Sequence, residues 1–152
     1  LNPQQPIFLK MPADISFEEI DKLVDVVLTH KVHGLILSNL TKRRDSNLIH
    51  PNDIVHSQKG GISGRPVFDP SNDLIEHLYK RVGDKLILIG TGGIFSAQDA
   101  YEKILRGASL VQLATGMIFR GPQLIGQINR GLVELLKRDG FNSIKEAIGK
   151  RQ

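Results

Sequence analysis

The chain has 152 residues, a formal net charge of +4, 40% hydrophobic and 24% charged residues, and no cysteine. This is the composition of a soluble globular protein, and it excludes disulfides, thiolate zinc sites and a cysteine nucleophile. No apolar run approaches the roughly 20 residues that cross a bilayer, and no targeting segment is recognisable. Aromatic residues are few, 5%, and do not alternate with the basic ones, so we expect no nucleic-acid partner.

The N-terminal part of the chain predicts two strands with a helix between them. Residues 6–10 form a short apolar run that predicts a buried strand. Ser16 and Glu19 have the spacing of a capping box, and an apolar stripe at helical spacing follows from Phe17 to Leu28. The continuous apolar run within residues 33–38 predicts a second strand, of the kind that is buried on both faces of a parallel sheet.

The next segment, residues 39–65, has no hydrophobic period. It contains a basic cluster at residues 42–44, a turn-like sequence from Pro51 to Asp53, and the glycine-rich residues 60–64. Irregular segments of this length inside a compact domain are usually functional or mobile. We therefore expect this segment to form part of a site.

Regular patterns then return and predict two further strands, each followed by a helix. A helix near residues 71–82 precedes a strand at 85–89, which ends in Gly-Thr-Gly-Gly before a helix at 96–106. A strand at 109–113 follows, with a looser version of the same glycine turn after it. The last helices are predicted after Pro122, a residue suited to a first helical position, and from Ser143.

Four strands, each followed by a helix, favour neighbouring parallel strands joined by right-handed crossovers. Four strands do not close a barrel of eight. The sequence thus predicts one α/β unit over residues 1–152, which is either an open parallel sheet or half of a TIM (β/α)8 barrel.

Polar residues at the carboxyl ends of the first two predicted strands are candidates for chemistry. Lys10 would point into the mouth of a barrel, where its charge could stabilise an enolate, a phosphate or a reduced flavin. Ser38 and Asn39 end the second strand at the same level, and an Asn side chain offers both a donor and an acceptor. The alternatives are an exposed strand-edge lysine and a turn-forming asparagine.

Two glycine-containing segments predict a phosphate site. Gly92 and Gly93, with residues 114–116 after the next strand, would place bare backbone N–H groups and helix N-termini at one point, a suitable arrangement for phosphate. The earlier segment containing Gly60, Gly61, Ser63 and Gly64 would let a flat ligand approach the backbone. Arg120 could add charge; packing turns and a flexible loop are the alternatives.

The sequence contains neither a metal-binding constellation nor a convincing general base or nucleophile. Its five histidines stand apart along the chain, and no carboxylate pair has a spacing that favours acid–base work. We expect no metal site and no catalytic residue of this kind in the chain.

In combination, these segments resemble the C-terminal half of a class 2, quinone-linked dihydroorotate dehydrogenase, a TIM-barrel flavoenzyme of pyrimidine biosynthesis. The motifs that carry the resemblance occur in the right order: FLKMPADIS, GLILSN, KGGISGRP, IGTGGIFSAQDAYEKILRGASLVQLATG and IFRGP. The resemblance implies FMN-dependent oxidation of dihydroorotate to orotate, with electrons passed to a quinone. It also implies peripheral attachment to a bacterial or mitochondrial inner membrane, through the half of the barrel that is missing here.

The resemblance assigns roles to individual residues. Lys10 would lie beside the flavin ring and Asn39 would bind orotate. The other residues expected at FMN are Ser38, Ser63, Gly64, Gly92, Gly93, Ala114 and Thr115. Three positions depart from the family pattern: Leu40 where a substrate-contacting Thr is usual, Ala114 where an aromatic residue is usual, and KMPAD in place of KIAPD.

A whole member of this family would be about twice as long and would carry the general base in its first half. We therefore expect the chain to be part of a complete barrel and inactive alone. Two alternatives stay open: a non-catalytic half-barrel that binds phosphate or pairs with itself, and another phosphate-binding barrel enzyme that acts on a sugar phosphate.

Overall fold

A computed structural model describes residues 5–56 and 59–151, so the ends of the predicted 1–152 unit lie outside the described residues. The strands and longer helices alternate along the chain, with short helices between them. The strands are β1 (Phe8–Lys10), β2 (Gly34–Leu37), β3 (Ile87–Thr91) and β4 (Leu110–Gln112). The α-helices are α1 (Phe17–Thr29), α2 (Pro51–His56), α3 (Phe68–Val82), α4 (Ala97–Leu105), α5 (Thr115–Arg120), α6 (Gln123–Arg138) and α7 (Ile144–Ala147), with short 3-10 helices at Arg65–Val67 and Gly83–Lys85.

The four strands form one parallel sheet in the order β1-β2-β3-β4, as the sequence predicts. One face of the sheet is covered: Leu35 and Leu88 pair in register and are fully buried. On the opposite face, Ile87 and Leu110 are 41% and 57% exposed. Apolar side chains on an uncovered sheet face are expected in half of a barrel, whose interior needs the remaining strands to fill it.

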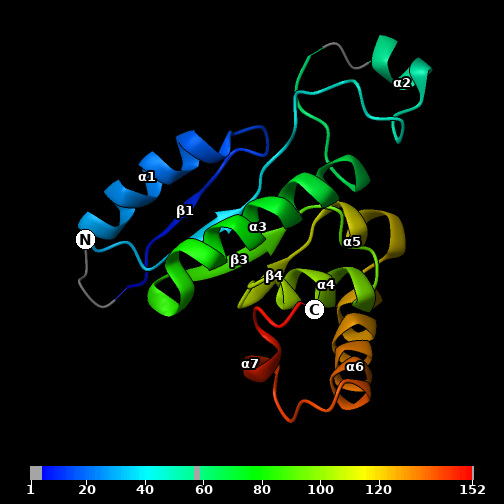
Figure 1. Cartoon of the computed structure of the whole chain (residues 1–152). Coiled ribbons are helices and arrows are strands. Elements are labelled where there is room, and N and C mark those ends of the chain that lie inside the picture. Colours follow the sequence, from blue (N-terminus) through cyan, green and yellow to red (C-terminus); the bar gives the residue numbers. More distant parts are fainter. Residues whose placement is uncertain (1–4, 57–58, 152) are drawn as a thin grey trace.

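The core consists of two clusters of buried side chains on the covered face. One joins α1 and α3 to β2 and β3, and the other joins α4 to α6 and α7. Helix α6 runs beside α4, whereas α2 stands away from the sheet (Figure 1). The predicted capping box is confirmed, because the Ser16 hydroxyl accepts from the Glu19 N–H and the Glu19 carboxylate accepts from the Ser16 N–H.

The structure differs from the predicted elements in four places. Strand β3 spans Ile87–Thr91 rather than 85–89, because a 3-10 turn occupies Gly83–Lys85 and the ladder with β2 continues to Gly90. The turn expected at Pro51–Asp53 is the start of α2, a short helix with no apolar period to reveal it. Helix α3 begins at Phe68 rather than near residue 71, because a 3-10 turn leads directly into it. Residues 115–120, expected to be part of a glycine turn, form the separate helix α5.

Tyr101 gives the packing of α4 on α6 a measurable pH dependence. Its hydroxyl is buried and donates to the Asp139 carboxylate at 2.8 Å, and burial together with this bond raises the pKa of Tyr101 from 10.0 to about 12. The folded chain therefore holds the phenol proton more tightly than the unfolded chain. This contribution to stability is complete below pH 10 and is lost as the pH rises toward 12.

We expect the free energy of unfolding, measured with urea, to fall between pH 9.5 and about 12 in the parent. The fall in Tyr101→Phe should be smaller by up to about 2 kcal/mol, because this variant has no phenol proton to lose. Gln127, which is exposed on α6, does not titrate, so Gln127→Ala is a suitable control and should follow the parent. Equal slopes for Tyr101→Phe and the parent would contradict this assignment.

Candidate functional site

A pocket of about 100 Å³ lies where the carboxyl ends of the strands meet. Its lining includes all ten residues that the sequence predicts as cofactor or substrate contacts: Lys10, Ser38, Asn39, Leu40, Ser63, Gly64, Gly92, Gly93, Ala114 and Thr115. Sites that enclose a whole small molecule usually measure about 300–1,000 Å³. The residues therefore form one wall of a larger site, which we name the strand-end pocket.

Several further residues line the strand-end pocket, and others that the sequence favours do not. Val67, Thr91, Ile94 and Leu113 line it without having been predicted. Thr91, Ile94 and Leu113 lie within or next to a predicted turn or strand end, and that adjacency was the available signal, whereas Val67 carried none. By contrast Gly60, Gly61 and Arg120 are absent from its lining. A Cβ at Gly61 would collide with the Cβ of Leu40, so this glycine serves packing rather than ligand approach.

The turn after β3 can form only because two consecutive residues lack a side chain. Gly92 and Gly93 have φ values of +102° and +72°, which residues with a Cβ rarely adopt. A Cβ on Gly93 would also stand 2.5 Å from the Cβ of Phe68. The chain then enters α4, whose N-cap Ser96 accepts from the Asp99 N–H at 3.2 Å.

An ion pair joins this turn to the glycine-rich segment before α3. The Arg65 guanidinium donates to both carboxylate oxygens of Asp99, at 2.7 and 3.1 Å, and the Phe95 N–H donates to the same carboxylate at 2.9 Å. Arg65 also lies over the rings of Phe68 and Phe95. Because Gly64 precedes Arg65 and Gly93 lies close to Phe95, this pair fixes two walls of the strand-end pocket against each other. We call it the Arg65–Asp99 clamp.

Hydroxyl groups tie the remaining walls together. The Thr115 hydroxyl donates to the Ser63 hydroxyl at 2.8 Å, across 52 residues of sequence. Thr41, which is buried, donates to the Asp14 carboxylate and exchanges backbone hydrogen bonds with Ile62. The loop after β1, the two ends of the irregular segment after β2 and the start of α5 are therefore held to one another beside the pocket.

The lining of the strand-end pocket is rich in donors and has no acid. Lys10 contributes an exposed ammonium group at the end of β1, and Ser38, Ser63 and Thr115 contribute hydroxyls. Among the described residues, no carboxylate and no imidazole lines it. The arrangement suits an anionic ligand.

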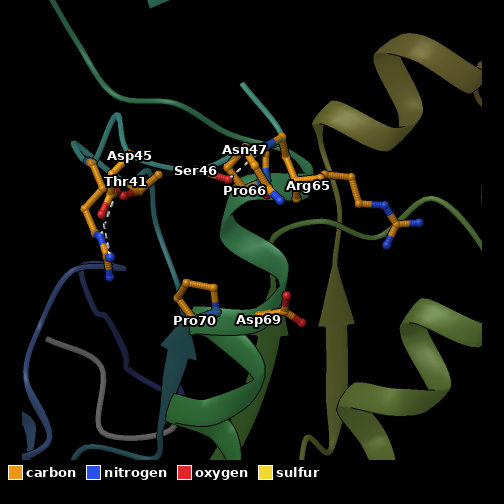
Figure 2. A pocket seen from close by; sticks show the side chains of 10 residues that line it. Thr41, Asp45, Ser46, Asn47, Arg65, Pro66, Asp69 and Pro70 are labelled. Atoms are coloured by element: carbon orange, nitrogen blue, oxygen red, sulfur yellow. Dashed lines mark hydrogen bonds and ion pairs between the residues drawn. The ribbon is translucent and has the colours of Figure 1, made fainter. Parts of the chain in front are cut away.

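A second pocket, of about 240 Å³, lies between residues 41–48 and the start of α3. Two of its lining residues, Arg43 and Asp45, form an ion pair, and Arg44 next to them donates to the carbonyl oxygens of Lys42 and Gly60. Figure 2 shows the side chain of Arg65 leaving this pocket in the direction of α4. The basic cluster at residues 42–44 thus organises its own loop.

Two of the histidines, His33 and His77, make structural contacts. The His33 ring accepts from the Ile7 N–H at 3.0 Å, and His77 bonds to Asp21 at 2.9 Å and stacks on Phe17. In residues 5–56 and 59–151, no three metal-ligating side chains come together. Within the same ranges, no helix is long and apolar enough to span a bilayer.

Comparison with known proteins places these residues in context. The family model for dihydroorotate dehydrogenase matches residues 2–136. A dihydroorotate dehydrogenase (quinone) of Nocardia farcinica is 44% identical over 144 residues, which are 95% of this chain and 39% of that protein. The mitochondrial dihydroorotate dehydrogenase (quinone) of Arabidopsis thaliana is also 44% identical, over 31% of its length.

Solved structures agree with the sequence comparison. The dihydroorotate dehydrogenase of Eimeria tenella, crystallised with ferulenol, superposes with a TM-score of 0.86 at 34% identity, covering 93% of this chain and 37% of that one. The chain thus spans about two-fifths of the length of the relatives that it matches.

Proposed function

Because the chain belongs to the dihydroorotate dehydrogenase family, in its quinone-linked class, we propose that the strand-end pocket binds FMN as part of a complete barrel. That barrel oxidises dihydroorotate to orotate and passes the electrons to a quinone. The observation that carries this proposal is the convergence of all ten predicted residues on one donor-rich pocket. FMN, when bound, supplies the two-electron acceptor for the substrate.

The residues present fit FMN by the chemistry of their donors. The phosphate requires N–H and O–H donors and close backbone approach, which Gly92, Gly93 and Thr115 provide. The lining carries no carboxylate that would repel a phosphate. Ser63 and Gly64 would lie along the flavin, with Ala114 beside the phosphate contacts.

Lys10 and Ser38 would act at the ring, and Asn39 at the substrate. Negative charge that develops on the ring would be stabilised by the Lys10 ammonium group. The Asn39 amide offers a donor and an acceptor to the C=O and N–H edges of orotate. Leu40 gives this edge of the site an apolar contact in place of a hydroxyl.

Two components must come from strands that these residues do not contain. One is the general base, a proposal supported by the lining of the strand-end pocket, which has no carboxylate and no imidazole among the described residues. The other is the cover for the sheet face that exposes Ile87 and Leu110. We propose that a half-barrel partner supplies both, together with the contacts to a membrane, and that the chain alone does not turn over dihydroorotate.

The test is complementation. The chain is expressed alone and together with the part of the Nocardia farcinica relative that its alignment with this chain leaves uncovered. We expect the purified pair to be yellow, to hold one FMN, and to lose its flavin colour on addition of dihydroorotate. A well-formed pair without FMN refutes the proposal, and tight binding of simple phosphates by that pair would favour a sugar-phosphate enzyme instead.

A variant of Lys10 separates the flavin chemistry from flavin binding. The Lys10 side chain is exposed, so Lys10→Met should leave the fold intact and retain FMN. We expect reduction of the bound FMN by dihydroorotate to slow by about 100-fold, as when one electrostatic stabiliser is removed. Lys31→Met, another exposed lysine, is the matched control and should reduce at the parent rate. Equal rates for the two variants would remove Lys10 from the proposed site.

A further inference from the structure

Lys103, in the last turn of α4, is a lysine with no exposed surface. Its stem crosses β3 at Gly90, where an added Cβ would stand 3.0 Å from the Lys103 Cδ. The ammonium group donates to Asn72 Oδ1 at 2.9 Å and to Ser71 Oγ at 3.1 Å, and lies 5.0 Å from the centre of the Phe68 ring. None of the ion pairs in the described part of the chain includes it. A methionine would fill this volume without the cost of burying a charge.

The Lys103 ammonium group sets the direction of the hydrogen bonds that run from it through Ser71 to the ends of β2 and β3. An ammonium group can only donate, so Ser71 Oγ must accept from Lys103 and turn its single hydrogen elsewhere. Two carbonyl oxygens are within reach of that hydrogen, Thr91 O at 2.6 Å and Leu37 O at 3.1 Å. Thr91 O is the nearer and so the favoured acceptor.

This chain of bonds ends at the strand-end pocket. Thr91 O also accepts from the Ser38 N–H at 3.3 Å, one residue past the last paired positions of β2 and β3, Leu37 and Gly90. Ser38 lines the pocket, and Thr91 is followed by Gly92. The link through Ser71 therefore stands where the ladder between β2 and β3 stops and the site begins.

We propose that Lys103 is a positioning residue that, through Ser71, fixes the spacing between the ends of β2 and β3 and so between the flavin-ring contact and the phosphate turn of the site. This inference rests on the proposed function, which assigns Ser38 to the flavin and Gly92 to its phosphate. It adds a residue that touches neither ligand and lies behind the pocket wall.

The charge of Lys103 changes within the physiological range. Burial, with a smaller effect of Arg106, lowers the pKa of Lys103 from 10.5 to about 7, while Asp99, Asp69 and Glu102 oppose the shift. These carboxylates lie on α3 and α4, and Gly90 of β3, against which the Lys103 stem packs, has no side chain to titrate. A neutral amine can accept as well as donate, so above pH 7 the Ser71 hydrogen is free to turn toward Lys103 and release Thr91 O.

The test compares FMN affinity in the parent and four variants of the complemented pair. Lys103→Met and Ser71→Ala should each weaken FMN binding by about 5-fold at pH 6, the effect of one hydrogen bond, and the double variant should weaken it no further. Lys80→Met, on the exposed side of α3, should bind as the parent does. The ratio of the FMN affinity of the parent to that of Lys103→Met should fall as the pH rises through 7. Titration of the FMN phosphate affects both proteins equally and therefore does not change this ratio.

Hydrogen exchange of the chain without FMN provides a readout that is independent of the proposed function. The Ser38 amide should exchange faster in Lys103→Met and in Ser71→Ala than in the parent, whereas amides in α6 should be unchanged. Folded variants with parental Ser38 exchange overturn the inference. If Lys103→Met does not fold, Ser71→Ala decides alone. A parent pair that binds no FMN refutes the proposed function but leaves the exchange result to judge the positioning role.

Discussion

Replacing Asp99 with alanine is expected to lower the free energy of unfolding by about 2–3 kcal/mol. The Asp99 side chain is 9% exposed and receives two bonds from Arg65 and one from the Phe95 N–H. Its loss leaves the guanidinium between two phenylalanine rings without its anion and leaves a backbone donor unpaired. Because Arg65 is 47% exposed, water recovers part of this loss, and the value stays below that for a fully buried pair.

The chain offers a matched control for this prediction. Arg43 and Asp45 also form a two-bond arginine–aspartate pair, at 3.2 and 2.9 Å, but both side chains are about two-thirds exposed. Asp45→Ala should leave the free energy of unfolding close to that of the parent. Urea denaturation of the two variants measures the difference, and Asp99→Ala should also weaken FMN binding in the complemented pair. Similar losses for both variants would show that the Arg65–Asp99 clamp is only a surface pair.

Gly116→Ala should have the largest effect of any single methyl group added to the site. A Cβ at this position would lie far inside 3.0 Å from the carbonyl oxygen of Ile94, and a backbone atom cannot move aside as a side-chain end can. We expect a loss of about 3 kcal/mol or more in the free energy of unfolding, at the upper limit of overpacking effects. The same methyl group would separate α5 from the turn after β3, so FMN binding should be lost as well.

Gly126→Ala is the control for Gly116→Ala. Gly126 is also within a helix, α6, and the nearest atom to its added Cβ is Arg130 Nη1 at 3.9 Å. Since alanine is the better helix former, this variant should gain up to about 1 kcal/mol in stability. Opposite signs for the two glycine variants are the expected result of thermal or urea denaturation. A Gly116→Ala chain as stable as the parent would mean that α5 does not pack on Ile94.

The parallel order of the strands and the position of the pocket could be predicted because both depend on local sequence. Each strand is a short apolar run, and the residues just past its carboxyl end reach one edge of the sheet whatever the loops do. Gly92 and Gly93 were recognisable because a turn with positive φ needs glycine. The start of α1 was recognisable because Ser16 and Glu19 satisfy each other's backbone donors within four residues.

Contacts between distant segments could not be predicted in this way. Arg65 and Asp99 are 34 residues apart, and neither lies in a pattern that indicates the other. Lys103 carried a weak signal: it lies three residues after the buried Ala100 and next to Ile104, on the apolar face of α4, opposite a glycine in a buried strand. Helix α2 carried none, since its six residues, PNDIVH, are too few to show a helical period.

Within the described residues, the sheet has two unpaired edges, β1 and β4, and its strands all point the same way. A ring closes on such a sheet only if the added strands continue in the same direction and meet both edges at once. A second copy of this chain satisfies that condition as well as a complementing half does, since its β1 can lie beside β4 and its β4 beside β1. The homodimer and the complemented pair therefore compete by mass action. A low concentration of this chain, or simultaneous synthesis of both halves, favours the complemented pair, which holds a single, complete site.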